Sequence, residues 1–173
     1  MTVILGIDPG SRVTGYGLID TVGNKLEYVH CGCIKSLNET FPDRLKKIHA
    51  ELLEVIDLHA PHQAAIEEVF VGRNASSALK LGQARGAAMV ACLSHNLPIE
   101  EYSARQVKKA VAGTGSAAKN QVQYMVKALL KISDNIGEDA ADALAIAICH
   151  ANTQNSLIRM AGSKPYSKKH VRS

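Results

Sequence analysis

Two features that the sequence lacks indicate in which compartment this protein acts. No stretch of the sequence approaches the roughly 20 consecutive apolar residues that a membrane-spanning helix requires. Residues 1–8 also lack the basic region of a secretory signal peptide and reach an acidic residue at once. These features predict a cytoplasmic protein that does not interact with a membrane. Its 173 residues, of which 46% are apolar and 21% charged, fit one globular domain.

Cysteine and histidine show no spacing that builds a metal or redox centre. Cys31 and Cys33 are separated by one residue, which suits neither a zinc site nor a C-x-x-C motif, and Cys92 and Cys149 are isolated. The seven histidines include no H-x-x-x-H pair. We therefore interpret the cysteines as small buried residues in a reducing compartment, and the histidines as surface or core residues.

The charges are segregated along the chain, although the net charge is only +4. Residues 73–131 hold 9 basic and 2 acidic residues, whereas residues 1–72 hold 6 basic and 10 acidic ones. Residues 132–158 contain 4 acids and no Lys or Arg, and residues 159–173 contain 5 basic residues and no acid. A basic surface beside an acidic centre suits a metal-using enzyme that acts on a polyanion. Solvated helix faces would produce charged stretches as well.

The hydrophobic pattern predicts a β-β-β-α-β-α-β-α-α-α order. Three strands joined by short turns form an antiparallel meander, and later strands alternate with helices, as in parallel β-α-β units. We therefore expect an α/β fold with a five-stranded mixed sheet and helices on both faces. The expected strands cover residues 3–7, 13–20, 26–35, 64–70 and 97–102, and the expected helices cover 41–58, 75–93, 103–113, 116–131 and 138–150. Ser116 is the expected cap of the fourth helix.

Two acidic residues stand where apolar strands are expected to end. Asp8 follows five apolar residues, so its carboxylate must be paired, neutralised or bound to a metal. Glu67 ends a second apolar strand, and it shares an edge of the sheet with Asp8 if the two strands are parallel. Asp8 could instead cap the Pro-Gly turn, and Glu67 could be an exposed strand end. The neighbouring Glu68 points to the opposite face of its strand.

Two further acids, Asp139 and Asp142, stand three residues apart in an apolar, alanine-rich helix, and therefore share one face. Acids near a helix N-terminus can simply stabilise the helix dipole. Together with Asp8 and Glu67, however, they supply the carboxylate oxygens that Mg²⁺ and Mn²⁺ prefer. Two such ions about 4 Å apart can generate a hydroxide nucleophile and stabilise the leaving oxygen of a phosphodiester.

At these residues the sequence resembles the RuvC family of Holliday-junction resolvases. The matching stretches follow one another from the N-terminus to about residue 150. They are GIDPGSRVTGYG (residues 6–17), AIEEVF (65–70), NASSALKLGQARG (74–86), ARQVKKAVAGTGSAAK (104–119) and DAADALAIA (139–147). GIDPG alone also resembles the first strand and turn of sugar kinases and actin-like ATPases, but 173 residues are too few for their duplicated domain.

The resemblance implies a ribonuclease-H-like fold, which we assign to residues 1–155. The composition of residues 156–173 predicts a basic, flexible tail, for which the resemblance gives no firm match. The resemblance implies an Mg²⁺-dependent crossover junction endodeoxyribonuclease that makes paired, symmetric nicks in four-way DNA junctions during homologous recombination and DNA repair. It further implies a homodimer that pairs through a helix at about residues 78–93, and a branch-migration motor of the RuvA and RuvB type as partner. Two ions per site are expected, with Mn²⁺ as a substitute.

The resemblance also assigns residues. Asp8, Glu67, Asp139 and Asp142 match the catalytic metal ligands. Lys108 and Lys119 match basic residues that contact DNA near the cut, and Phe70 matches an aromatic residue that stacks at the junction. Arg73 and Asn74, in the polar loop after Phe70, are expected to contact DNA too. The sequence departs from close relatives at Glu68, where a neutral amide is common.

Three alternatives are open from the sequence. The same fold could carry a ribonuclease H or another nuclease with a single site. The chain could be a nucleotide binder of the actin-like or sugar-kinase type, although its length is against this. It could also bind junctions without cutting them, although the presence of all four carboxylates is against this.

Overall fold

The computed structural model describes residues 1–69 and 74–162. The elements follow the predicted order. The strands are β1 (Thr2–Asp8), β2 (Val13–Val22), β3 (Lys25–Lys35), β4 (Gln63–Glu67) and β5 (Ile99–Tyr102). The helices are α1 (Phe41–His59), α2 (Ala75–Ser94), α3 (Ala104–Ala112), α4 (Lys119–Leu130) and α5 (Glu138–Gly162).

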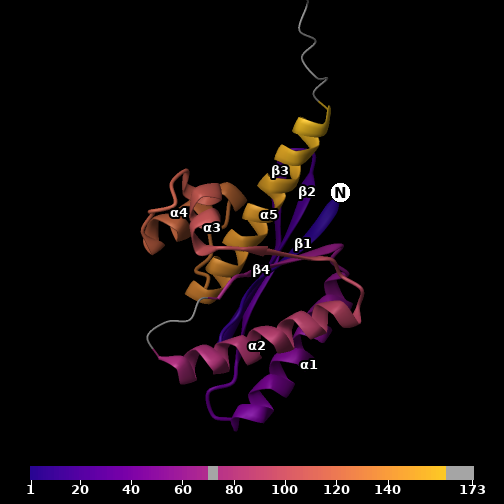
Figure 1. Ribbon diagram of the computed structural model, residues 1–173. Coiled ribbons are helices and arrows are strands. Elements are labelled where there is room, and N and C mark those ends of the chain that lie inside the picture. Colours follow the sequence, from indigo (N-terminus) through magenta and orange to yellow (C-terminus); the bar gives the residue numbers. More distant parts are fainter. Residues whose placement is uncertain (70–73, 163–173) are drawn as a thin grey trace, which may run out of the picture.

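The five strands form one mixed sheet in the order β3-β2-β1-β4-β5. The first three strands pair antiparallel as a meander, and β4 and β5 continue the sheet in parallel with β1. Helices α1 and α2 cover one face of the sheet, and α3, α4 and α5 cover the other (Figure 1). This arrangement confirms the predicted α/β fold with helices on both faces.

Side-chain alternation divides the sheet between two apolar cores. Leu5, Ile7 and Ile66 pack against α1 and α2, whereas Ile4 and Ala65 pack against α3, α4 and α5. A strand turns successive side chains to opposite faces, so residues an even number of positions away from Ile4 lie on the α5 face. The α5 face is therefore the one on which the acids that end β1 and β4 lie.

Helix α5 lies unusually close to the sheet because β1 and β2 present glycine to it. A Cβ atom on Gly6 would lie 2.1 Å from the carbonyl oxygen of Ala143, and one on Gly15 would lie 2.0 Å from that of Asp139. Only a residue without a side chain fits at either position. Further along the helix, the buried His150 is within hydrogen-bond distance of Tyr102 Oη (2.9 Å) and Gln63 Oε1 (2.8 Å). The helix is thus fixed to β1, β2, β4 and β5.

Two details of the sequence prediction are wrong. Ser116 does not cap α4, which begins at Lys119 with Ala118 as its N-cap residue. The Ser116 hydroxyl lies 3.0 Å from that of Thr114 instead, within a turn that precedes the helix. Helix α5 does not end near His150 but continues through Gly162.

The extension of α5 is mostly exposed and has a tertiary contact where Arg159 Nη2 donates to Asn24 Oδ1 at 3.1 Å. Residues 156–162 of the expected tail are therefore helical. Residues 163–173 lie outside the described part of the chain, so the division into a nuclease domain and a flexible tail stays a prediction. Among residues 1–69 and 74–162, no helix combines the length and the apolar character that a membrane span requires.

The close approach of α5 leads to a stability prediction. Replacing Gly6 with Ala places a methyl group against the backbone of α5, which cannot rotate away. We expect the free energy of unfolding to fall by about 3 kcal/mol, at the upper end of overpacking costs in protein cores. Urea unfolding followed by circular dichroism measures this change.

Gly137→Ala is the matched control, because a Cβ atom built on the exposed Gly137 meets only Cys33 Sγ, at 3.7 Å, within the described chain. We expect it to change the free energy of unfolding by less than about 1 kcal/mol, since this is an ordinary van der Waals distance. Equal losses in the two variants would contradict the account of α5 packing.

Candidate active site

Asp8 and Glu67 end two neighbouring parallel strands. The register of β1 and β4 pairs the residues that precede them, so the two acids occupy equivalent positions. Both lie an even number of residues from members of the α5 core, Ile4 in β1 and Ala65 in β4, and therefore face α5. Because adjacent strands are about 4.8 Å apart, the two carboxylates are neighbours at one edge of the sheet.

Asp139 and Asp142 approach the same edge from α5. Asp139 is in the first turn of the helix, where its backbone lies against Gly15 of β2. Asp142 follows one turn later, and 27% of its side chain is exposed. Acids are favourable at this end of a helix because the helix dipole is positive there. The glycine contacts thus bring the second pair of acids to the first.

The electrostatics of Asp8 show that the four acids act on one another. Burial, followed by the charges of Glu67, Asp142 and Asp139, raises the pKa of Asp8 from 3.8 to about 8, and Lys119 opposes this rise. A carboxyl group in such surroundings keeps its proton at neutral pH, because the protein cannot solvate another negative charge there.

The pKa of Glu67 is also raised. Burial and then the charge of Asp142 raise its pKa, whereas a hydrogen bond with Asp8 and the charges of Lys108 and Lys119 act to lower it. A protonated Asp8 can donate to an ionised Glu67, so the two strand-end acids share a proton when no cation is present. Without a cation, the acidic side chains of the site therefore cannot all be ionised at once.

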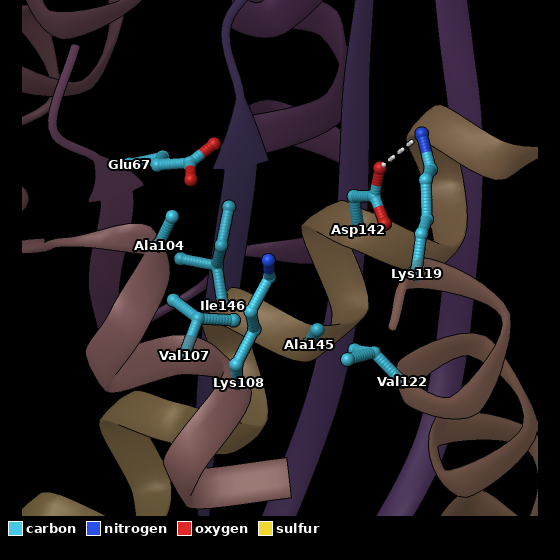
Figure 2. Close-up of a pocket in the computed structure, with 9 residues that line it drawn as sticks. All are labelled: Glu67, Ala104, Val107, Lys108, Lys119, Val122, Asp142, Ala145 and Ile146. Atoms are coloured by element: carbon cyan, nitrogen blue, oxygen red, sulfur yellow. Dashed lines mark ion pairs between the residues drawn. The ribbon is translucent and has the colours of Figure 1, made fainter. Parts of the chain in front are cut away.

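Two lysines from α3 and α4 face these acids. Lys119 Nζ lies 3.0 Å from Asp142 Oδ2 and 3.3 Å from Glu138 Oε2. Figure 2 shows that the Lys108 side chain extends towards the gap between Glu67 and Asp142. Both candidate DNA-contacting lysines thus line one pocket with two of the candidate metal ligands, Glu67 and Asp142.

The pocket has a volume of about 170 Å³, and one wall of it is apolar (Figure 2). Glu67, Asp142 and the two lysines supply its charged lining, and small or branched side chains from α3, α4 and α5 form the apolar wall. The lining residues are Glu67, Ala104, Val107, Lys108, Lys119, Val122, Asp142, Ala145 and Ile146. Apolar surroundings strengthen the interactions between the charged groups, because they reduce the screening by water.

The donor set fits a hard divalent cation. Carboxylate oxygens are its preferred ligands, and a cation would relieve the repulsion that keeps Asp8 protonated. Within residues 1–69 and 74–162, no three Asp, Glu, His or Cys side chains already converge as a ligand set. Asp142 is instead directed towards the Lys119 ammonium group, which neutralises it.

Sequence comparison gives a match to the model of the family Crossover junction endodeoxyribonuclease RuvC over residues 4–150. The RuvC endonuclease of Photobacterium profundum is 59% identical over 162 residues, which make up 94% of either chain. That of Vibrio vulnificus is 54% identical over 169 residues, 98% of either chain. The chain belongs to the RuvC family.

Solved structures agree with this assignment. Thermus thermophilus RuvC, solved in complex with Holliday junction substrate, is 38% identical, with a TM-score of 0.84 over 90% of this chain and 96% of that one. The yeast mitochondrial Holliday junction resolvase Ydc2 has the same fold at 14% identity and a TM-score of 0.62. The predicted RuvC family and ribonuclease-H-like fold are thus confirmed. Nucleases of the RuvC family depend on divalent metal ions.

The remaining predicted site residues of this RuvC-family chain lie at the start of α2. Phe70 and Arg73 are outside the described residues, so their predicted contacts with DNA stay predictions. Asn74 is exposed and caps α2, where its side-chain Oδ1 accepts a hydrogen bond from Ser77 N at 3.1 Å. Glu68 is half-buried and does not line the pocket.

Sequence reasoning missed the partners of the acids and the apolar wall. The pairing of Lys119 with Asp142 joins the start of α4 to α5, and no local pattern predicts it. Val107 in α3 and Ile146 in α5 each belong to an apolar helical pattern typical of core residues. Nothing in the sequence distinguishes a residue of a pocket wall from a residue of the core. The basic composition of residues 73–131 was the available signal for the lysines.

The raised pKa of Asp8 predicts how stability depends on pH without metal. The folded protein keeps a proton on Asp8 up to about pH 8, whereas the unfolded chain loses it near pH 4. Stability is therefore lost as the pH rises towards 8, by at most about 1.4 kcal/mol per pH unit. Urea unfolding in EDTA at pH 6.5 and 8.0 measures this loss of stability. We expect the loss to be smaller in Asp8→Asn, and we expect Mg²⁺ added in place of EDTA to offset it in the wild-type protein.

Asp134→Asn is the matched control, since Asp134 is an exposed acid in the loop before α5. We expect it to keep the wild-type dependence on pH. A wild-type slope that Asp8→Asn leaves unchanged would show that Asp8 ionises normally in the folded protein.

Proposed function

We propose that this chain resolves four-way DNA junctions by cutting them with a metal site built from Asp8, Glu67, Asp139 and Asp142. As a member of the RuvC family it is a crossover junction endodeoxyribonuclease. The observation that carries the residue assignment is the placement of Asp8 and Glu67 at the ends of adjacent parallel strands, with the α5 turn that bears Asp139 and Asp142 packed against β2 beside them. Such crowding of negative charge favours the binding of a divalent cation.

The four carboxylates would hold Mg²⁺, with two ions per site and with Mn²⁺ as a substitute, because both ions favour oxygen ligands. When bound, the ions supply a hydroxide nucleophile and stabilise the leaving oxygen. The side chains must first change partners, as Asp8 gives up its proton and Asp142 leaves Lys119. The freed Lys119 ammonium group would then be available to a backbone phosphate near the cut.

The proposed substrate is a four-way DNA junction, nicked symmetrically in two strands during homologous recombination and DNA repair. The Thermus thermophilus relative has been solved with a Holliday junction. Lys108 and Lys119, which line the same pocket as Glu67 and Asp142, would hold the backbone phosphates near the cut. Phe70, Arg73 and Asn74, before and at the start of α2, are proposed to contact DNA next to them.

Amide variants test the metal site. We expect Asp8→Asn, Glu67→Gln or Asp142→Asn to lower cleavage of an end-labelled four-way junction at least about 1000-fold, because each removes an anionic ligand. Junction affinity measured without metal should stay within a few-fold of wild type, since basic side chains supply it. Glu68→Gln, next to Glu67 and outside the pocket, is the matched control and should cut normally.

Other outcomes point to other functions. Metal-dependent symmetric nicks by the wild-type protein support a resolvase. Cleavage of RNA·DNA hybrids in preference to junctions would indicate a ribonuclease H, and binding without cleavage under any metal would indicate a junction-binding protein. Near wild-type cleavage by Asp8→Asn would overturn the site assignment itself.

We also propose a homodimer that pairs through α2. Leu79, Val90 and Leu93 lie along one exposed stripe of this helix, with 69%, 53% and 56% of each residue exposed. Gly82 and Gly86 lie between them, and nothing in the described chain occupies the space above either one. Such a surface allows two helices to approach closely, and a two-fold dimer would place two active sites on a two-fold junction.

A charge in this stripe should separate the subunits. Leu93→Glu is expected to convert a dimer to a monomer in analytical ultracentrifugation, because it would bury an unpaired carboxylate in the interface. Leu58→Glu is the matched control, since Leu58 is 77% exposed at the end of α1 and lies outside the stripe. A Leu93→Glu protein that sediments as wild type would place the interface elsewhere.

The remaining proposals follow from the family. We propose that the protein acts in the cytoplasm, beside a branch-migration motor of the RuvA and RuvB type. Residues 1–155 would form the nuclease domain, and the basic segment 156–173 would extend from it. A pull-down of the motor proteins with the purified full chain, with and without a junction, tests this partnership.

A further inference from the structure

Arg85 in α2 joins the end of β4 to β5 from behind the active site. Its Nε donates to the backbone carbonyl oxygen of Glu67 at 3.0 Å, and its Nη2 pairs with the carboxylate of Glu101 in β5. Its Nη1 lies 3.3 Å from Met89 Sδ, one turn along α2. Only 16% of the Arg85 side chain is exposed. The guanidinium group is therefore fixed by three contacts on three elements.

The contact with Glu67 acts on the backbone of a proposed metal ligand. Helix α2 covers the face of the sheet opposite α5, so Arg85 approaches β4 from the side away from the pocket. Arg85 holds the carbonyl group, while the Glu67 side chain faces α5. The last residue of a strand has few neighbours to hold it, and a hydrogen bond there limits how far its side chain can shift.

The planar guanidinium group is suited to this position. Its donors point in fixed, divergent directions, so that one side chain can span two strands. Glu101 neutralises the charge of the Arg85 guanidinium group and fixes its plane. Strand β5 also pairs with β4 next to the Glu67 carbonyl group, since Glu68 N donates to Tyr102 O at 2.9 Å. A lysine ammonium group is a single point of charge, which cannot make both contacts with the same geometry.

We propose that Arg85 is a positioning residue for metal-dependent cleavage: it fixes the β4 end that carries Glu67 and ties it to α2. This inference rests on the proposed role of Glu67 as a metal ligand. Because the same helix carries the stripe proposed as the dimer interface, Arg85 also connects that interface to the active site through a single side chain.

Arg85→Lys and Arg85→Ala test the proposal by separating cleavage from binding. We expect single-turnover cleavage of a four-way junction at fixed Mg²⁺ to fall about 10- to 100-fold, as is typical when the residues that orient metal ligands are changed. Mn²⁺ affinity, followed by electron paramagnetic resonance without DNA, should weaken. Junction affinity in metal-free buffer should change less than about two-fold. Guanidinium at low millimolar concentration should partly restore cleavage by Arg85→Ala.

Two further variants separate positioning from folding. Glu101→Gln keeps the Arg85 contact with Glu67 but removes its ionic partner, and should lose less activity than Arg85→Ala. Lys47→Met is the matched control, because Lys47 on α1 also pairs with two acids, Glu39 and Glu51, away from the site. It should retain wild-type cleavage and Mn²⁺ affinity. Thermal unfolding shows whether each variant is folded at the assay temperature.

The results distinguish this inference from the proposed function. If the wild-type protein cuts junctions and Asp8→Asn does not, the assignment of the metal site is supported, whatever the Arg85 variants show. The positioning role is then overturned if folded Arg85→Lys and Glu101→Gln proteins both keep the wild-type cleavage rate and Mn²⁺ affinity. It is also overturned if cleavage and junction affinity fall together while Mn²⁺ affinity does not change, since Arg85 would then act on DNA.

Discussion

The direct contact between the backbone of α5 and the glycines of β1 and β2 is the constraint on which the candidate site depends. Any side chain at Gly6 or Gly15 would overlap a carbonyl oxygen of α5. Without that contact the helix would sit farther from the sheet, and Asp139 and Asp142 would lie farther from the strand-end acids. The fold thus brings together carboxylates that are more than 70 residues apart in the sequence.

This concentration of acid destabilises the protein on its own, and the structure shows how the effect is reduced. Asp8 takes up a proton, with a pKa raised to about 8, and Lys119 pairs with Asp142 and Glu138. In the proposed metal site both adjustments would be reversed, and a metal ion would replace the proton and the ammonium group. The lysine that neutralises the acids in the free protein would then be available to a phosphate. On this proposal, the same few side chains affect both stability and activity.

The sequence predicted the order of the elements, the mixed sheet and the place of the four acids. These depend on local signals, namely apolar runs that end at Asp8 and Glu67 and an alanine-rich helix with Asp139 and Asp142 on one face. The pairing of Lys119 with Asp142, and the reach of Arg85 from α2 to the Glu67 carbonyl, were not predicted. Both are contacts between elements distant in sequence, and they follow from side-chain packing that no local periodicity records.

The most direct test of the metal site is a crystal structure of the protein grown with Mn²⁺, with the anomalous signal of the metal measured. The account predicts anomalous density at the ends of β1 and β4, within about 2.3 Å of carboxylate oxygens of Asp8 and Glu67, with Asp142 released from Lys119. Manganese bound only elsewhere, with Asp142 still paired to Lys119 and an empty space beside Asp8, would contradict it.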